Sequence, residues 1–294
     1  MQPFDASFTE RAPAKVNLTL RVLGRREDGY HALASLVAFA GIGDGLAFRP
    51  GGAFALETSG PMAQAAGAAD RNLVLVAAQA LAARVPNLIA GRFHLTKRLP
   101  VSAGLGGGSA DAAAALRLLA RANALAPDDP RLHEAALATG SDVPACLASR
   151  ACLMGGRGEV VEPVMLPFCA AVLLNPGVPI ATALVFHALS LRPGEMHAGL
   201  AHPPHTALAL DRAALFALLA HLPNDLEPVA RRLAPTLEEA ASSLAATSDV
   251  RLVRMSGSGA TLFGLYDSCR AAGAAAKALR AAHPHWWIKP TVLR

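Results

Sequence analysis

The sequence predicts an α+β protein of two domains, and three observations lead to this prediction. The chain has 294 residues, 53% of them hydrophobic and 17% charged, which is enough apolar material for two compact cores. Segments with the alternating apolar pattern of strands occur between alanine- and leucine-rich segments typical of helices. The segment 151–167 is glycine-rich and strand-like, and we place the domain boundary there, giving domains 1–163 and 164–294.

The first predicted strand, at 14–22, alternates apolar residues such as Val16 and Leu18 with polar ones. Because successive side chains of a strand point to opposite faces, Lys15 and Asn17 are expected together on the face opposite the core. Further elements of the first half follow in order: strands at 35–40 and 45–49, a helix at 73–84 and a strand at 91–97.

The stretch LPVSAGLGGGSADAAAAL, residues 99–116, places four glycines within five positions directly before an alanine-rich helix predicted over 109–126. Ser109 is the expected N-cap, Asp111 lies in the first turn, and Pro127 ends the helix. A glycine-rich loop that leads into a helix N-terminus exposes several backbone N–H groups, which bind anionic oxygens. We therefore expect a phosphate site here, with a flexible turn before a core helix as the alternative.

Known phosphate motifs narrow the kind of site that this stretch can form. It lacks the lysine of G-x-x-x-x-G-K-[ST], and it misses the last glycine of G-x-G-x-x-G. The stretch is therefore neither a Walker A loop nor a dinucleotide-binding fingerprint.

The rest of the chain continues the alternation of helical and strand-like segments. A shorter helical segment at 133–139 precedes the sequence GSDVPACL, and the glycine-rich segment follows. The second half contains a strand at 170–175, a helix at 182–189, a surface loop at 191–205, helices at 211–221 and 225–244, two strands joined by a small-residue turn within 251–266, and a helix at 268–282. Helices interspersed with paired strands predict an α+β second domain.

Composition excludes several classes of protein. The net charge of +5 comes from scattered lysines and arginines, and it suits an anionic small molecule as well as nucleic acid. The aromatic content of 5% argues against a stacking surface for single-stranded nucleic acid. A polar start without a signal peptide, and no apolar run approaching ~18 residues, favour a cytoplasmic protein with no membrane partner.

Metal and redox sites are not expected from the cysteines and histidines. The four cysteines form no C-x-x-C pair, so neither a zinc ribbon nor a redox motif is indicated. His202 with His205, and His283 with His285, have no further ligands at suitable spacing, and we interpret both pairs as exposed loop residues.

Three separated stretches resemble the superfamily of galactokinase, homoserine kinase, mevalonate kinase and phosphomevalonate kinase. They are APAKVNLTLRVLGRREDGYHAL at 12–33, the glycine stretch at 99–116 with GSDVPACL at 140–147, and MSGSGATLFGLY at 255–266. The resemblance covers nearly the whole chain. It implies a two-domain small-molecule kinase fold, with a ribosomal-S5-like α/β domain first and a ferredoxin-like α+β domain second. The G-L-G-G-G-S form of the loop, with AKVNL and DGYH, indicates the branch that acts on a cytidine-diphosphate-linked polyol.

That resemblance implies ATP-dependent transfer of a phosphoryl group to the 2-hydroxyl of a methylerythritol unit, in the non-mevalonate route to isoprenoid precursors. In the family a lysine and an aspartate flank this hydroxyl, and they correspond to Lys15 and Asp142. Asp142 is the expected base, and Lys15 would keep it ionised and steady the charge on the oxygen. Without the resemblance we would favour an exposed strand residue for Lys15 and a helix cap for Asp142. Mg²⁺ is expected to bridge the phosphates, with Ser109 as a candidate ligand.

The resemblance also assigns binding residues. Asn17 would bond substrate hydroxyls, Tyr30 would stack on the cytosine, His31 would read the base edge, and Thr182 and Phe186 would share one helix face, with Phe186 on the other side of the base. Taken alone, Phe186 is more often a core residue and His31 a turn residue. The residues expected around the ATP phosphates are Pro100, Val101, Ser102, Ala103, Gly104, Leu105, Gly106, Gly107, Gly108, Ser109 and Ala110. Those of a second glycine turn that closes the site are Ser256, Gly257, Ser258 and Gly259.

Two other functions stay open at this point. One is another alcohol kinase of the same superfamily, such as a homoserine or mevalonate kinase, which would not need the base-reading residues Tyr30, His31 and Phe186. The other is a nucleotide-binding protein without catalysis, against which the pairing of Lys15 with Asp142 argues. We expect no nucleic-acid partner, and a monomer or homodimer.

Overall fold

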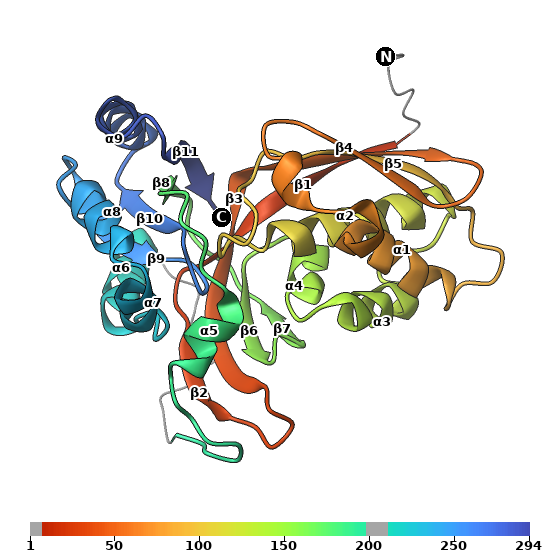
Figure 1. Cartoon of the computed structure of the whole chain (residues 1–294), viewed down its shortest axis with the longest axis horizontal. Helices are drawn as coiled ribbons and strands as arrows, with labels where there is room; N and C mark the ends of the chain where they lie inside the picture. The colour runs from red at the N-terminus through yellow and green to blue at the C-terminus, as the bar shows by residue number, and fades with distance from the viewer. Residues whose placement is uncertain (1–7, 198–210) are drawn as a thin grey trace. The chain divides into compact units, whose positions relative to one another are not determined.

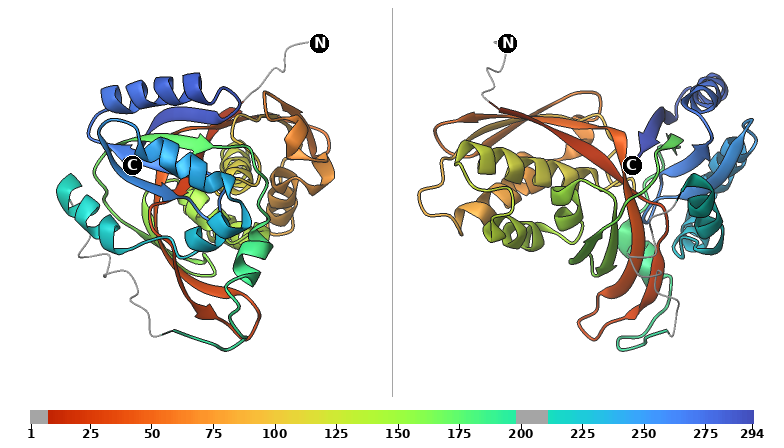
Figure 2. Two further views of the ribbon diagram at one scale, coloured as in Figure 1. Left: turned by 60° about the vertical axis from the view of Figure 1, so that its left-hand side comes forward. Right: turned by 180° about the vertical axis from the view of Figure 1, so that it is seen from behind.

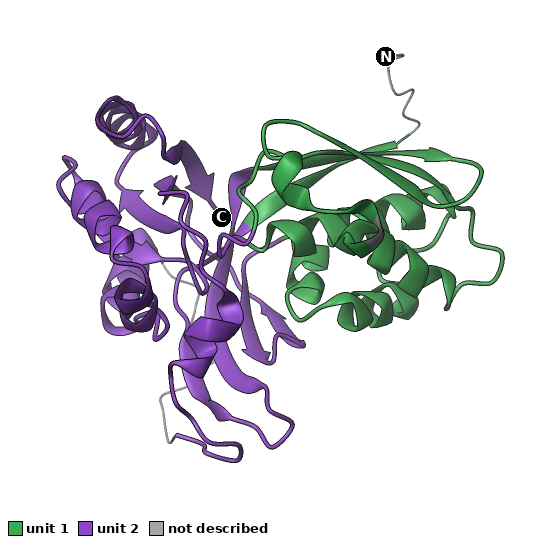
Figure 3. Ribbon diagram, in the orientation of Figure 1, with its two compact units in different colours: residues 1–14, 43–101, 106–149 green, residues 15–42, 102–105, 150–294 purple. Residues whose placement is uncertain are grey.

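The computed structural model describes residues 8–197 and 211–294, and by its contacts the chain forms two compact units (Figure 3). Unit 1 comprises residues 1–14, 43–101 and 106–149, and unit 2 comprises residues 15–42, 102–105 and 150–294. The chain therefore passes between the units several times. The division into domains 1–163 and 164–294 stays a prediction.

Unit 1 combines a small sheet with a group of helices (Figure 1). Residues Gly45–Pro50 of β3 (His31–Pro50) pair antiparallel with β5 (Gly91–Thr96), which pairs parallel with β4 (Ala55–Ser59). The unit also contains the first part of β1 (Phe8–Asn17), two short 3-10 helices, η1 (Gln64–Ala66) and η2 (Ala69–Arg71), and the helices α1 (Leu73–Ala82), α2 (Gly107–Ala122), α3 (Pro130–Thr139) and α4 (Val143–Ala148). The helix α2 is central, since α1, α3 and α4 all pack against it.

The long strand β3 corrects the prediction of two separate strands at 35–40 and 45–49. The glycines between the two predicted segments allow close packing within one continuous strand. A Cβ atom on Gly43 would overlap the backbone of Ala12 and Pro13 in β1, so only glycine lets the two strands approach.

Unit 2 contains an antiparallel sheet whose strands lie in the order β11–β8–β10–β9. These strands are β8 (Cys169–Asn175), β9 (Val250–Met255), β10 (Leu262–Tyr266) and β11 (Trp287–Leu293). The helices α8 (Thr236–Ala245) and α9 (Cys269–Ala282) pack against the sheet, as both views of Figure 2 show. Every residue of β8 is buried, as its continuous apolar run predicts.

A second group of elements completes unit 2. It consists of β2 (Arg21–Arg25), which pairs with the start of β3, the hairpin of β6 (Cys152–Gly156) and β7 (Val160–Pro163), and the helices α5 (Thr182–His187), α6 (Arg212–His221) and α7 (Glu227–Leu233). The predicted helix 225–244 is wrong as a single element, because it breaks between α7 and α8 at Ala234 and Pro235. The strands β4 and β11 were not predicted, and the helix α4 was expected only in the interpretation of Asp142 as a helix cap.

Candidate active site

Lys15 and Asn17 lie side by side in a buried polar network of unit 2. Lys15 is 4% exposed, and its Nζ donates a hydrogen bond to Asn17 Oδ1 at 3.1 Å. Asn17 Nδ2 donates to Ser35 Oγ at 2.7 Å, and that hydroxyl donates to the Thr19 carbonyl oxygen at 2.6 Å. The two residues share a face, as the alternation predicted, but this face is buried, so the interpretation of Lys15 as a solvent-exposed strand residue is wrong.

The second glycine turn contacts both this strand and the start of the glycine loop. Ser256 Oγ accepts a hydrogen bond from the Asn17 N–H at 3.1 Å and donates one to the Gly104 carbonyl oxygen at 2.8 Å. The N–H of Thr261 donates to the Ala103 carbonyl oxygen at 3.1 Å. A Cβ on Gly104 would overlap the Ser256 carbonyl oxygen, and Gly104 also has a φ of +73°. Two loops distant in sequence therefore require glycine because their backbones touch.

The helix α2 begins earlier than predicted, and this changes the role of Ser109. The N-cap is Gly106, with a φ of +58°, and the first helical hydrogen bond runs from the Ala110 N–H to the Gly106 carbonyl oxygen at 2.8 Å. Ser109 is thus the third residue of the helix and not its cap. The N–H groups of Gly107, Gly108 and Ser109 have no carbonyl partner within the helix, which is the donor arrangement that binds anionic oxygens.

Asp111 also differs from its prediction as a first-turn carboxylate. It lies one turn further on, 2% exposed, where its Oδ2 accepts a hydrogen bond from Lys97 Nζ at 2.6 Å. The same ammonium donates to Asp44 Oδ2 at 2.6 Å, and Asp44 Oδ1 accepts from the Leu99 N–H at 2.9 Å. A Cβ on Gly107 would lie 3.3 Å from Lys97 Nζ. This buried cluster of unit 1 therefore lies beneath the first turn of α2.

Asp142 lies at the N-cap position of α4, half-buried in unit 1. Its side chain makes no capping hydrogen bond to the helix, whereas its carbonyl oxygen accepts one from the Cys146 N–H at 3.1 Å. The backbone of Asp142 therefore begins the helix, as the cap interpretation expected, but its carboxylate is not used for capping.

The residues expected to bind a base lie in unit 2. The rings of His31 and Phe186 pack together, with centroids 4.7 Å apart and planes tilted by 32°. Tyr30 is 53% exposed, and the guanidinium of Arg157, a residue not predicted, lies 4.9 Å from its ring centroid. The buried Nε2 of His31 has no hydrogen-bond partner among the described residues. Burial, and then the nearby charge of Arg25, lower the pKa of His31 below its usual value, which keeps the ring neutral near pH 7.

Thr182 and Phe186 belong to the same short helix, α5, four residues apart, as expected. Thr182 Oγ1 lies 2.9 Å from Ser258 Oγ, within hydrogen-bond distance. The second glycine turn is thereby linked to α5 as well as to Asn17 and Gly104. Unit 2 alone thus brings together most of the residues that the three sequence stretches singled out.

Among residues 8–197 and 211–294, no group of three His, Cys, Asp or Glu side chains could hold a metal ion. His202 and His205, with the end of the expected loop 191–205, lie outside the described residues. No helix in the described part of the chain is long and apolar enough to cross a membrane. Of the four cysteines, Cys269 is exposed and the others are buried, and no disulfide joins any of them.

Comparison with known proteins gives consistent matches. The family model described as the GHMP kinases N terminal domain matches residues 72–150, and that for the GHMP kinases C terminal domain matches residues 205–285. A protein of Xanthobacter autotrophicus named 4-diphosphocytidyl-2-C-methyl-D-erythritol kinase is 59% identical over 97% of this chain and 98% of its own length. One of the same name from Rhodopseudomonas palustris is 55% identical, covering 96% of each.

Solved structures give the same result. A crystal structure of 4-(cytidine 5'-diphospho)-2C-methyl-D-erythritol kinase matches with a TM-score of 0.76 and 36% identity, covering 97% of this chain and 99% of that one. Homoserine kinase from Cytophaga hutchinsonii matches in fold alone, with a TM-score of 0.66 and 17% identity over 99% of this chain and 96% of that one. The predicted mixed α+β kinase fold is confirmed by these matches.

Proposed function

The chain belongs to the 4-diphosphocytidyl-2-C-methyl-D-erythritol kinases of the GHMP kinase family, and on that premise we propose how its residues carry the reaction. It is an ATP-dependent kinase that phosphorylates the 2-hydroxyl of 4-(cytidine 5'-diphospho)-2-C-methyl-D-erythritol. The observation that supports our assignment best is the buried Lys15–Asn17 pair, which is hydrogen-bonded to the second glycine turn. Asn17 fixes the position of the Lys15 ammonium, and an ammonium fixed beside the reacting hydroxyl would stabilise the charge of a developing alkoxide.

ATP would bind with its phosphates at the first turn of α2. The N–H groups of Gly107, Gly108 and Ser109 supply donors, and the positive end of the helix dipole adds to their attraction for anions. Mg²⁺ fits this arrangement as an ion held chiefly by the phosphates, with the half-buried Ser109 hydroxyl as its candidate protein ligand. Such an ion offsets charge on the transferred phosphoryl group.

In the transfer itself, the Asp142 carboxylate takes the proton of the 2-hydroxyl as the oxygen attacks the γ-phosphorus, and ADP leaves. The Lys15 ammonium steadies the charge that develops on the attacking oxygen. Asn17 would bond the neighbouring hydroxyls of the polyol. Since Asn17 is also fixed by Ser35 and Ser256, its amide is held in one orientation.

The cytidine would be recognised by Tyr30, His31 and Phe186. Phe186 and the exposed ring of Tyr30 offer faces for stacking. The unpartnered Nε2 of His31 can pair with an edge of the base, because a buried polar nitrogen without a partner gains by finding one. Homoserine and mevalonate carry no base, so these three residues favour the cytidyl substrate over either of them.

A cytoplasmic location, and a monomeric or homodimeric state, stay predictions.

The base assignment is tested with Asp142→Asn, which keeps the shape of the side chain and removes its charge. We expect turnover to fall at least ~10²-fold while the stabilisation of the protein by ATP stays nearly unchanged. Asp128→Asn, at an exposed position, is the matched control and should behave as the wild type. ADP release with the cytidyl substrate measures turnover, and full activity of Asp142→Asn would remove the assignment.

The base-reading role is tested with His31→Ala, compared with His133→Ala at an exposed position. We expect a higher KM for the cytidyl substrate and an unchanged KM for ATP in the first variant only. An equal rise for both substrates would contradict the role of His31. Running the same assay with homoserine and mevalonate on the wild type decides between the cytidyl substrate and the alternative acceptors.

A further inference from the structure

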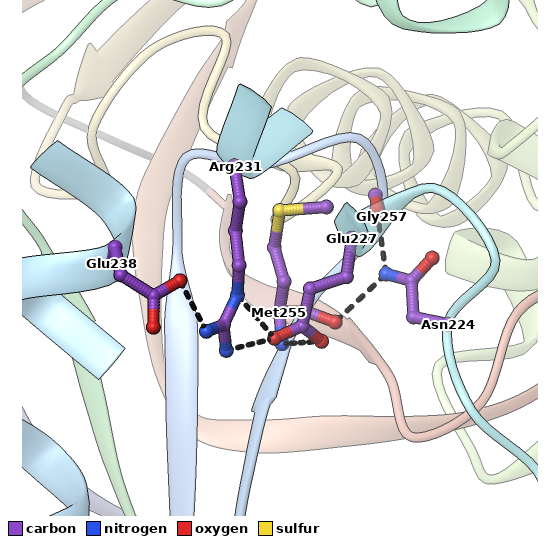
Figure 4. A network of polar contacts seen from close by, with 6 residues as sticks. All are labelled: Asn224, Glu227, Arg231, Glu238, Met255 and Gly257. Atoms are coloured by element: carbon purple, nitrogen blue, oxygen red, sulfur yellow. Dashed lines mark hydrogen bonds and ion pairs between the residues drawn. The ribbon is translucent and has the colours of Figure 1, made fainter. Parts of the chain in front are cut away.

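A short segment of unit 2, Asn224–Glu227, makes hydrogen bonds to the second glycine turn and to the strand that leads into it (Figure 4). Asn224 is 1% exposed, and its Nδ2 donates to the carbonyl oxygens of Met255 and Gly257, both at 2.8 Å. Its Oδ1 accepts from the Leu226 N–H at 2.9 Å. Both N–H donors and the oxygen acceptor of this buried amide are therefore hydrogen-bonded. The two donors bond the turn and the residue before it.

Glu227 bonds Met255, the residue directly before the turn and the last of β9. Its Oε2 accepts a hydrogen bond from the Met255 N–H at 2.9 Å. Its other oxygen pairs with Arg231, four residues later, and Arg231 in turn pairs with Glu238 at 2.8 Å. Figure 4 shows these four side chains and backbone groups as one connected network. The carboxylate of Glu227 is thus held in a single orientation against the strand that leads into the turn.

The hydrogen bonds of Asn224 determine which way the turn presents its amide groups. In a trans peptide the C=O and N–H point in opposite directions, and the peptide between Gly257 and Ser258 is trans. Since the Gly257 carbonyl oxygen points at Asn224, the Ser258 N–H points away from it. The Ser258 hydroxyl lies within hydrogen-bond distance of Thr182, and the Ser256 hydroxyl bonds Asn17 and Gly104. Asn224 therefore orients the backbone whose side chains contact Asn17, Gly104 and Thr182.

The segment is itself anchored to the chain that follows Lys15 and Asn17. The Leu20 N–H donates to the Pro223 carbonyl oxygen at 3.2 Å, and the Asp225 N–H donates to the Leu20 carbonyl oxygen at 2.8 Å. The Asp225 carboxylate accepts from the Val22 N–H at 2.9 Å. The segment is thus hydrogen-bonded both to the chain that follows the strand of Lys15 and to the turn.

From these contacts we propose that Asn224 and Glu227 are positioning residues for phosphoryl transfer, which act through the Ser256–Gly259 turn on Asn17, Gly104 and Thr182. The proposal rests on the proposed function of those three residues. Neither side chain touches the reacting atoms. Their effect is to keep the turn in one conformation, because small displacements of positioning groups cost large factors in rate.

The main variant is Asn224→Asp, which keeps the size of the side chain and the acceptor for the Leu226 N–H. It replaces the two donors by a carboxylate that faces two carbonyl oxygens. We expect kcat/KM for the acceptor substrate to fall at least ~10-fold, and the amides of residues 256–261 to exchange with solvent faster. Lowering the pH should restore part of the activity of this variant, because a protonated carboxyl regains one donor.

Two controls separate positioning from a loss of stability. Glu238→Gln removes the exposed end of the same network and should leave kinetics unchanged, since its side chain is 64% exposed. Thr247→Val removes the 2.7 Å hydrogen bond to the buried Tyr266 hydroxyl elsewhere in unit 2. It should lower Tm without changing KM or the pH profile. All kinetics are measured well below the Tm of each variant.

The inference is overturned when Asn224→Asp has wild-type kinetics, or when its losses equal those of a Thr247→Val protein of similar Tm. If Asn224→Asp does not fold, Glu227→Leu decides by the same comparison with Thr247→Val, because it removes the acceptor for the Met255 N–H. If the wild-type protein is inactive on the cytidyl substrate, the proposed function is refuted, and the positioning role is not decided by kinetics. The exchange of the turn amides then still tests whether Asn224 fixes the turn.

Discussion

Lys97, Asp44 and Asp111 form one buried cluster in unit 1. It contains one ammonium group, that of Lys97, and the two carboxyl groups of the aspartates. Burial acts to lower the pKa of Lys97, but the charges of Asp111 and Asp44 raise it above its usual value. Burial, opposed by Lys97 and reinforced by Asp44, raises the pKa of Asp111 from 3.8 to about 7. Asp111 Oδ1 has no partner among the described residues, which adds to the cost of its charge. The cluster favours a protonated Asp111 beside an ion pair of Lys97 with Asp44.

This arrangement predicts an unusual pH dependence of stability. The pKa of Asp111 is raised in the folded protein, so its contribution is fully present below about pH 4 and is lost as the pH rises through about 7. The variant Asp111→Asn lacks this carboxyl group, so its stability does not change with the titration of residue 111. We expect the free energy of unfolding of the wild type, measured by denaturant between pH 5 and 8, to decrease relative to that of Asp111→Asn by a few kcal/mol.

A constant difference between the two proteins over this range would show that Asp111 stays ionised. Asp44→Asn is the comparison in the same cluster, because it leaves Lys97 without its ionised partner. That variant should be destabilised by ~3–5 kcal/mol at pH 6, as expected when one partner of a buried pair is removed.

The sequence could place only some of these residues. Lys15 and Asn17 were expected on one face, because two residues apart on a strand is a local relation. Their burial was not foreseen, because it depends on packing by Ser35 and Ser256, which are remote in sequence. Lys97 and Asp44 carried no signal, since neither lies in a recognised motif. Asn224 was also missed, because its partners are backbone oxygens that no sequence pattern reveals.

At the scale of single elements, the glycines of the loop serve two different purposes. Gly104 has a positive φ and no room for a side chain, whereas Gly108 has neither restriction: a Cβ there would meet only Leu73 Cδ1 at 3.4 Å. The fold therefore requires glycine at the first position and not at the second. We propose that phosphate binding is the reason for glycine at position 108, because a methyl group would stand among the N–H groups at the start of α2.

We therefore expect Gly108→Ala to stabilise the protein by ~0.5–1 kcal/mol, since alanine is the better helix former, and to raise the KM for ATP several-fold. Denaturant unfolding and ADP release measure the two effects. The matched control is Gly273→Ala in α9, where an added Cβ meets open space. It should give a similar gain in stability with an unchanged KM. An unchanged KM in Gly108→Ala as well would argue against phosphate binding at this turn.

Gly104→Ala should behave in the opposite way. The left-handed φ costs about 1–2 kcal/mol for a residue with a Cβ, and the overlap with the Ser256 carbonyl oxygen adds to this. We expect a lower free energy of unfolding together with lower activity, measured on the same preparations. Wild-type stability of this variant would mean that the two glycine-rich loops do not touch.

The same distinction explains which elements could be predicted. Helices with a local signal were placed well: α1 and α6 match within two residues, and α9 was expected at 268–282. The strand β3 was divided in error, because a glycine needed for close approach to β1 looks the same in sequence as a glycine in a turn. The strand β11 was missed because it contains Pro290. A proline is tolerated there because β11 pairs along its length with β8 but with β3 at Leu293 only.

For the molecule as a whole, the two proposed catalytic residues belong to different compact units, with Lys15 in unit 2 and Asp142 in unit 1. Spacing and periodicity could not connect residues so far apart in the chain, and only the resemblance of both stretches to one family did so. Their cooperation in one reaction step is a claim that kinetics can test without reference to the arrangement of the units.

If Lys15 and Asp142 act on the same hydroxyl, their losses cannot multiply, because removing either group already abolishes the step that the other assists. Lys15→Met and Asp142→Asn should each lower kcat at least ~10²-fold. The kcat of the double variant should lie within ~10-fold of the kcat of the less active single variant. Independent roles would instead give the product of the two losses, about 10⁴-fold. Saturating ADP-release kinetics on the four proteins of this cycle measure the difference. Asp142→Asn combined with Gly273→Ala is the control, and its kcat should equal that of Asp142→Asn alone.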